Sequence, residues 1–256
     1  MSEAQQEDAV LVERRGRVMI ITLNRPEAMN AINGALSHGL WNAVQELNND
    51  PGLTAGVLTG NGRGFCSGMD LKAFARGEDI GPLSKFIRAG CEKPLIGAVE
   101  GFAIAGGCEL ALTCDLLVAA KGAKIGIREV KVGLFAAAGG LFRLPSRVGY
   151  AKAMEMAITG DPITAEEAHA AGMISQLTEP GGSVDAAIAL AERVAKNAPL
   201  AVAASKKLVL AAAQGFDEPT LWKMQEPLQK QVFTSNDAKE GPRAFAEKRE
   251  PNWTGT

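Results

Sequence analysis

The stretch GFAIAGGCELALTCD, residues 101–115, places one carboxylate just inside an apolar helical pattern that begins with two glycines. The first N–H groups of a helix have no intrahelical partner and carry partial positive charge, and glycine lets a ligand approach them closely. Glu109 follows Gly106 by three residues, so it faces the same side about one turn later. Donors that stabilise an oxyanion, beside a carboxylate that moves a proton, suit enolate chemistry. A favourable acidic residue in a first helical turn is the purely structural alternative.

A second loop has a similar sequence. GFCSGMD at residues 64–70 and GFAIAGG at residues 101–107 each follow an apolar segment, begin with Gly-Phe and continue through small residues. Met69 lies four residues after Phe65, as Gly106 lies four residues after Phe102. Two loops of similar conformation would direct two backbone N–H groups at one point, as an oxyanion hole requires. Because glycine-rich turns recur in any α/β protein, the similarity alone leaves both interpretations open.

The elements that must position these residues alternate between strands and helices. Short segments rich in β-branched residues predict buried strands at residues 18–24, 55–60, 94–101 and 115–120, with further strands at 123–127 and 173–178. Helical spacing predicts helices at 33–49 and 107–113, and the pattern is mostly helical from residue 150. Pro199 and Pro219 suit first helical turns. The predicted fold class is therefore α/β, ending in a helical segment from about Pro199.

Composition and motifs exclude several classes of protein. The 256 residues carry a net charge of −2, with no polybasic patch for nucleic acid and no apolar run of the ~20 residues that a membrane helix needs. The start, MSEAQQEDAV, is polar and acidic, unlike a signal peptide. The four cysteines form no C-x-x-C pair, so we expect reduced thiols and a cytoplasmic location. The sequence contains no Walker A, G-x-G-x-x-G, G-x-S-x-G or metal-binding spacing.

Six segments carry a family resemblance, and they occur in one order along almost the whole chain. They are LNRPEAMNAI, GRGFCSGMDLKAF, VEGFAIAGGCELALTCDLLVAA, EVKVGL, AAAGGLFRLPSRVGYAKAMEMAITGDPITAEEAHAAGMISQL and AFAEKREPNW. Together they resemble the enoyl-CoA hydratase/isomerase (crotonase) superfamily. The resemblance implies a crotonase-type spiral of ββα turns at residues 1–198 and a helical C-terminal region at 199–256 used in trimerisation, with hexamers also common. It further implies an acyl-CoA thioester substrate, no metal and no organic cofactor.

The resemblance also assigns roles to individual residues. The two oxyanion-hole N–H groups would belong to Met69 and Gly106, in agreement with the two similar loops. Glu109 and Glu129 match the two glutamates that hydratases use to hold and activate water. Without the resemblance, Glu129 would be interpreted as a solvated charge. The positions that resemble acyl-CoA contacts are Ala28, Asn30, Ser67, Asp70, Leu71 and Lys72, with Phe245 and Lys248 approaching the CoA of a neighbouring subunit in family trimers.

Two departures from the family pattern surround the second glutamate. Arg128 stands where many hydratases have Pro, and AAAGG at residues 136–140 replaces the usual Pro-Gly-Ala-Gly-Gly. A neighbouring cation would stabilise ionised Glu129, and a missing proline would loosen its placement.

Retention of both glutamates favours hydration of a 2-trans-enoyl-CoA to a 3-hydroxyacyl-CoA, because isomerases of the superfamily generally need only one. Double-bond isomerisation, or another crotonase-type reaction on an acyl-CoA, is the alternative chemistry. A non-catalytic RNA-binding relative is a third possibility, against which the absence of a basic stripe counts.

Overall fold

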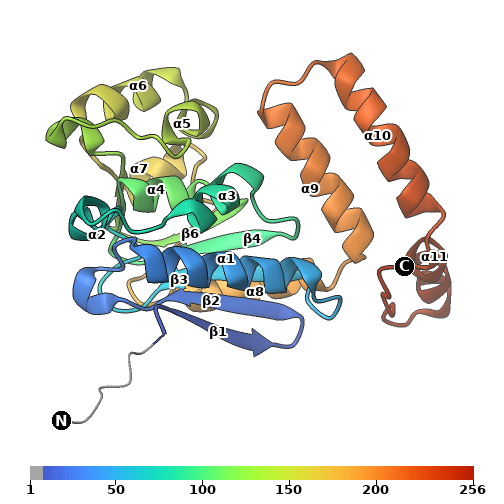
Figure 1. Cartoon of the computed structure of the whole chain (residues 1–256). Coiled ribbons are helices and arrows are strands. Elements are labelled where there is room, and N and C mark those ends of the chain that lie inside the picture. The colour runs from blue at the N-terminus through green and yellow to red at the C-terminus, as the bar shows by residue number, and fades with distance from the viewer. Residues whose placement is uncertain (1–7) are drawn as a thin grey trace, which may run out of the picture.

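A six-stranded sheet forms the centre of the structure, a computed structural model that describes residues 8–256 (Figure 1). The strands run in the spatial order β1, β2, β3, β4, β6, β9; β1 is antiparallel to β2, and the remaining neighbours are parallel. Their bounds are Val10–Arg15, Val18–Leu23, Ala55–Gly60, Leu95–Val99, Leu116–Ala120 and Gln176–Thr178. The expectation that the start of the chain is unlike a signal peptide rests mostly on residues 1–7, which lie outside the described residues.

Both faces of the sheet are covered by helices, as a buried parallel sheet requires. Along β2, Met19 and Ile21 point into the larger core, while Val18 and Ile20 point to the opposite face. Helix α1 (Gly34–Asn49) packs on the first face, and α8 (Ser183–Ala195) packs on the second through Ala187, Ile188 and Ala191. The alternating side chains of β2, β3, β4 and β6 therefore contribute to two separate cores.

Shorter elements connect this sheet to a second, three-stranded sheet. The second sheet consists of β5 (Phe102–Ile104), β7 (Lys124–Gly126) and β8 (Ile163–Thr164). The remaining helices before residue 199 are α2 (Leu71–Ala75), α3 (Gly81–Ala89), α4 (Gly106–Ala111), α5 (Gly140–Val148), α6 (Tyr150–Thr159) and α7 (Ala165–Ala170), with 3-10 turns η1 (Pro26–Ala28) and η2 (Glu129–Val132). The α/β fold class is confirmed.

The predicted strands are present, most with slightly shorter ends, and three strands were not predicted. β1 was missed because its residues are mostly exposed and two arginines interrupt the apolar pattern. β5 lies inside a stretch that was interpreted as a glycine-rich loop, and β8 has only two residues. The segment predicted at 173–178 is a strand only over Gln176–Thr178. Met173 and Ile174 are apolar because they are buried in the core, although they lie outside the strand.

Three C-terminal helices extend away from the central sheet (Figure 1). They are α9 (Pro199–Ala213), α10 (Glu218–Phe233) and α11 (Asn236–Glu247), and Pro199 and Pro219 occupy first-turn positions as predicted. Lys206 of α9 anchors this arm, because its ammonium donates hydrogen bonds to Cys91 O, Lys93 O and Asp115 Oδ2. Over residues 8–256, we find no helix with the length and apolarity that a membrane crossing requires.

Candidate active site

The two similar loops lie side by side. Phe65 N donates to Phe102 O at 2.9 Å, and Ile104 N donates to Cys66 O at 3.0 Å, so the loops pair like short parallel strands. This pairing accounts for the glycine at the start of each loop, because a side chain at Gly64 would collide with the Phe102 ring and one at Gly101 would collide with Arg63 O. The residues that follow, Met69 and Gly106, are consequently brought to the same place.

The backbone nitrogen atoms of Met69 and Gly106 lie close together. A Cβ built on Gly106 would lie 3.7 Å from Met69 N, and one built on Gly68 would lie 3.1 Å from Gly106 N. Within residues 8–256, neither N–H donates a hydrogen bond to the protein. Ala105, which precedes Gly106, has φ 53° and ψ −129°, a conformation that costs free energy for a residue with a side chain. The loop thus holds two unpaired donors beside each other, as an oxyanion hole requires.

Glu109 is held on α4 by the backbone of a distant loop. Its side chain is buried, and Oε1 accepts hydrogen bonds from Ala138 N at 2.7 Å and Gly140 N at 2.9 Å. Gly140 permits this approach, because a Cβ there would lie 3.0 Å from the Glu109 Cγ. Burial raises the pKa of Glu109, the two backbone donors oppose that rise, and the charge of Glu129 adds to it.

The residues that hold Glu109 were not predicted as part of the site. The run AAAGG was recognised only as a departure from the family pattern, although a glycine pair before a helix was a usable signal of a close backbone approach. Arg143 stabilises the same loop through hydrogen bonds. Its guanidinium donates to Thr113 Oγ1 at 3.2 Å and to Ile87 O at 2.5 Å, with a longer contact of 3.4 Å to Ala138 O. It therefore joins the end of α4, helix α3 and the loop that orients Glu109.

Glu129 stands at the start of η2 and lines an apolar cavity. Its Oε2 is buried and has no hydrogen-bond partner in the structure over residues 8–256. Burial raises the pKa of Glu129. The side chain of Arg128 is exposed, and Arg128 favours the ionised form of Glu129 through its backbone N–H, which only partly opposes the rise in pKa that burial causes.

The raised pKa of Glu129 predicts a stability effect that depends on pH. The folded protein keeps this proton to a higher pH than the unfolded chain, so the stability it confers is complete below the ordinary carboxyl pKa and is lost as the pH rises through the raised value. Glu129→Gln cannot ionise. We therefore expect the variant to melt roughly 2 °C above the wild type at about pH 8, and the difference to vanish near pH 4. Scanning calorimetry at both pH values tests this, and a less stable variant at pH 8 would contradict it.

Two predicted acyl-CoA contact residues, Asn30 and Asp70, hold the surrounding loops in place. Asn30 is fully buried, and its side chain donates to Asn61 O and Gly64 O and accepts from Arg25 N. The interpretation of Asn30 as a direct CoA contact is therefore revised, because no part of its side chain is available to a ligand. Asp70 caps α2 by accepting from Lys72 N and Ala73 N, and it forms an ion pair with Arg25 at 3.1 Å.

Other predicted contact residues are accessible. Leu71 and Lys72 are exposed at the start of α2, two and three residues after Met69. Ala28 and Ser67 are half-buried and close together, since Ser67 N donates to the carbonyl of the residue after Ala28. Phe245 belongs to α11 and Lys248 caps its C-terminal end, and Figure 1 shows α11 at the far end of the C-terminal arm, away from α2 and α4. Within one chain the structure does not bring these two residues to the site, so a contact with the CoA of a neighbouring subunit stays a prediction.

The chain is similar to known proteins over almost its whole length. The sequence model of the enoyl-CoA hydratase/isomerase family matches residues 13–256. The chain is 40% identical to enoyl-CoA hydratase EchA19 of Mycobacterium tuberculosis, over 99% of each chain, and 36% identical to 2,3-dehydroadipyl-CoA hydratase of Escherichia coli K12, over 96% of this chain and 98% of that one. The crystal structure of enoyl-CoA hydratase EchA1 from Mycobacterium marinum superposes with a TM-score of 0.93 at 54% identity, covering 98% of this chain and 100% of that one.

The protein belongs to the enoyl-CoA hydratase/isomerase family. The crotonase-type core inferred from the six sequence segments is confirmed by the structural match.

Proposed function

We propose that this protein is an enoyl-CoA hydratase that adds water to a 2-trans-enoyl-CoA and forms a 3-hydroxyacyl-CoA. The observation that carries the proposal is the juxtaposition of two carboxylates, Glu109 and Glu129, with the unpaired N–H groups of Met69 and Gly106. Relatives named enoyl-CoA hydratase, similar over nearly the full chain, support the same assignment.

In the proposed reaction, the thioester oxygen accepts hydrogen bonds from Met69 N and Gly106 N. Glu109 removes a proton from water while the water oxygen bonds to C3, and negative charge moves to the thioester oxygen. Glu129 then donates its proton to C2, which returns the electrons to the new C–H bond. Transfer of a proton from Glu109 to Glu129, directly or through water, restores the starting state. The addition is redox-neutral, so the mechanism uses no cofactor beyond the CoA of the substrate.

Raised pKa values at both carboxylates support this division of labour. One glutamate must carry a proton and the other must be ionised, and two nearby buried carboxyl groups share a proton more readily than two exposed ones. Burial is the main influence on the pKa of Glu129 and favours its protonated form, although the backbone N–H groups of Arg128 and Glu129 act in the opposite direction. At Glu109, the N–H groups of Ala138 and Gly140 both donate to Oε1 and favour the ionised base.

Incubation of the protein with a panel of acyl-CoAs, followed by mass spectrometry, tests the proposal. A product heavier by one water from 2-trans-enoyl-CoA is the expected result. A product of unchanged mass in which the double bond has moved would instead assign the isomerase alternative to the site.

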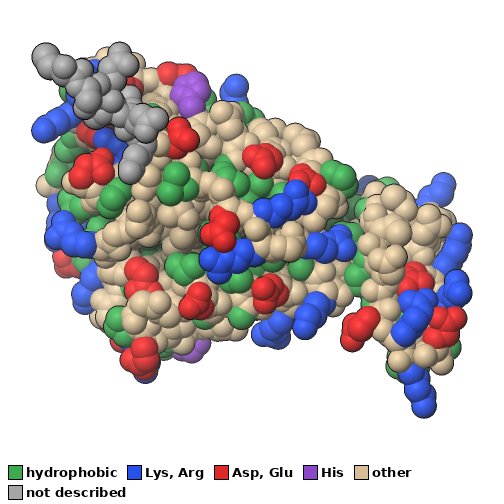
Figure 2. Space-filling model, turned by 90° about the horizontal axis from the view of Figure 1, so that it is seen from below, with side chains coloured by type: hydrophobic (Ala, Val, Ile, Leu, Met, Phe, Trp, Pro, Cys, Tyr) green, Lys and Arg blue, Asp and Glu red, His purple; other side chains and the backbone are tan. Residues whose placement is uncertain are grey.

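The charge distribution gives no support to the RNA-binding alternative. On the face shown in Figure 2, acidic and basic side chains are interspersed, and no continuous basic field is present among the described residues on that face. Binding to RNA depends on such a field. An electrophoretic mobility shift assay with RNA tests this alternative. If the protein shifts the RNA in a salt-dependent manner, it binds RNA, and catalysis is not its only function.

The C-terminal arm supports a further part of the proposal, that the protein is a homotrimer or homohexamer in which residues 199–256 form subunit contacts. Helix α10 contains no buried residue, yet it carries large apolar side chains. Trp222 and Phe233 are 57% and 70% exposed, and Phe245 of α11 is 87% exposed. Apolar groups exposed at this density along an arm are typical of a surface that another subunit covers.

Light scattering is expected to give a mass three or six times that of one chain. Deletion of Pro199–Thr256 should yield monomeric or insoluble protein, because the arm's apolar contacts are lost while the core surface it covered becomes exposed. A monomeric mass for the full-length chain would overturn this part of the proposal.

A further inference from the structure

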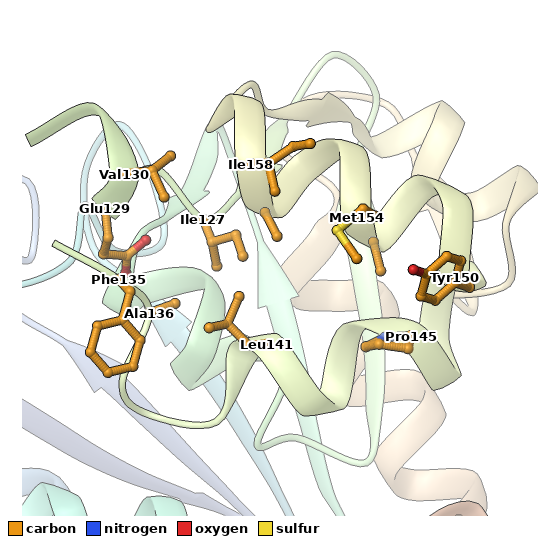
Figure 3. Close-up of a pocket in the computed structure, with 12 residues that line it drawn as sticks. Ile127, Glu129, Val130, Phe135, Ala136, Leu141, Pro145, Tyr150, Met154 and Ile158 are labelled. Atoms are coloured by element: carbon orange, nitrogen blue, oxygen red, sulfur yellow. The ribbon is translucent and has the colours of Figure 1, made fainter. Parts of the chain in front are cut away.

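An apolar groove begins at Glu129 and runs between helices α5 and α6. Its volume is about 380 Å³, and Glu129 is the only charged residue among the twelve that line it. Figure 3 shows Glu129, Val130 and Phe135 at one end, with Leu141 of α5 and Met154 and Ile158 of α6 flanking the space that leads toward Pro145 and Tyr150. The groove thus joins a catalytic carboxylate at one end to an uncharged channel.

The position of the groove relative to the reacting atoms suggests its occupant. Helix α4 presents Gly106 toward Met69, which precedes α2, and presents Glu109 toward Gly140, which begins α5. The thioester end of a substrate at Met69 and Gly106 therefore lies on the α2 side. The part of the acyl group beyond the reacting carbons must continue past Glu109 and Glu129, and Glu129 borders the groove.

The groove has the dimensions and chemistry of a site for a hydrocarbon chain. From Tyr150 to Ile158, helix α6 rises by roughly 12 Å. A butenoyl group reacting beside Glu129 would leave most of this length unfilled. Every lining residue other than Glu129 is uncharged, so a carboxylate or ammonium at the end of the acyl chain would find no partner of opposite charge among the residues that line the groove.

We propose that the acyl substrate of this protein is an uncharged hydrocarbon chain, several methylenes longer than butenoyl, which binds in the groove between α5 and α6. This inference rests on the proposed hydratase function, and it separates this chain from a relative such as 2,3-dehydroadipyl-CoA hydratase, whose named substrate ends in a second carboxyl group. Residues Met154 and Ala157 of α6, which line the groove, set the selectivity.

Steady-state kinetics with 2-trans-butenoyl-, 2-trans-octenoyl- and 2,3-dehydroadipyl-CoA provide the test. Each buried methylene is worth roughly fourfold, so partial burial of the additional carbons should raise kcat/KM for octenoyl-CoA about 30-fold over butenoyl-CoA. Dehydroadipyl-CoA should be a poorer substrate than octenoyl-CoA. Equal kcat/KM values across the panel, or a preference for dehydroadipyl-CoA, would overturn the proposal.

Two variants on α6 test whether the groove is the cause of the preference for the longer acyl chain. Ala157→Trp places a ring in the groove, and the ratio of octenoyl to butenoyl kcat/KM should fall at least about tenfold. Ala151→Trp is the matched control, because Ala151 is exposed and does not line the groove, and its ratio should equal that of the wild type. Should Ala157→Trp leave the ratio unchanged but lower the oligomeric mass, the groove is an interface between subunits and the proposal is wrong.

A gentler variant covers the case in which Ala157→Trp does not fold. Met154 is 40% exposed, so Met154→Lys keeps a similar length while adding a cation that can reach solvent. Selectivity should shift at least tenfold toward dehydroadipyl-CoA relative to octenoyl-CoA, since the terminal carboxylate gains a partner. An unchanged selectivity in the folded variant would contradict the proposal.

Binding of saturated thioesters distinguishes failure of this inference from failure of the proposed function. If none of the enoyl-CoAs is hydrated, the hydratase assignment fails, but butanoyl-CoA and octanoyl-CoA still report on the groove by calorimetric titration. Octanoyl-CoA should bind at least about tenfold more tightly, and Ala157→Trp should remove that difference. Equal affinities in the wild type would overturn the groove assignment independently of catalysis.

Discussion

Glu109→Gln and Glu129→Gln should each lower kcat for hydration at least ~100-fold while the affinity for CoA thioester changes little. Glutamine keeps the shape of both side chains, and in Glu109→Gln the amide oxygen can still accept from Ala138 N and Gly140 N. The amide cannot take a proton from water or give one to C2. The loss should therefore appear in kcat and not in KM.

Steady-state rates and calorimetric titration with an unreactive saturated acyl-CoA measure the two effects separately. Glu155→Gln is the matched control, because Glu155 is exposed on α6, and its activity should equal that of the wild type. If Glu129→Gln retains full activity while Glu109→Gln is inactive, one carboxylate suffices, and the two-glutamate mechanism must give way to isomerase chemistry.

The second large effect is expected at Gly106, where the backbone matters and no side chain is present. Gly106→Pro deletes one of the two N–H groups and should reduce turnover ~100-fold or more. Gly106 is the first residue of α4, a position where proline suits the helix and breaks no intrahelical bond. The positive φ of Ala105 is unfavourable before proline, so circular dichroism and oligomeric mass must first show that the variant folds.

Two control variants separate the N–H group from the space around it. Met69→Ala keeps its N–H and should lose little activity. Gly106→Ala also keeps the donor, but its methyl group would lie 3.7 Å from Met69 N, where it crowds the incoming oxygen, so an intermediate loss is expected. Near wild-type turnover by a folded Gly106→Pro protein would show that this glycine pair is only the start of a helix.

The proximity of Met69 and Gly106 could be anticipated because two local sequences share one pattern. Loops with the same spacing of Gly, Phe and small residues adopt similar conformations, and the structure joins them through Phe65, Cys66 and Phe102. The position of Glu109 followed likewise from helical spacing alone.

The support of Glu109 could not be anticipated in the same way. It depends on hydrogen bonds from Ala138 and Gly140, about thirty residues later in the chain, and on backbone groups that any residue except proline supplies. The environment of Glu129 could not be predicted from the sequence either. Its neighbour in sequence is a cation, whereas its neighbours in space are apolar, and burial among them decides its pKa.

The C-terminal arm shows a third limit. Its helices and both first-turn prolines were predicted, because capping and helical periodicity are local signals. The periodicity of α10 suggests an amphipathic helix with a buried face, yet within one chain that face stays exposed. A helix whose apolar side chains pack on another subunit has the same sequence pattern as one that packs on its own core.

The central claim, that Glu109 and Glu129 together add water to an enoyl thioester, is tested most directly by isotope transfer. Wild-type protein and the folded double variant Glu109→Gln/Glu129→Gln would each be incubated with 2-trans-octenoyl-CoA in ¹⁸O-labelled water, and the products analysed by fragment mass spectrometry. The mechanism predicts one ¹⁸O atom at the C3 hydroxyl group from the wild type and none from the double variant over the same time. Equal labelling by both proteins, or a wild-type product with a shifted double bond and no label, would contradict it.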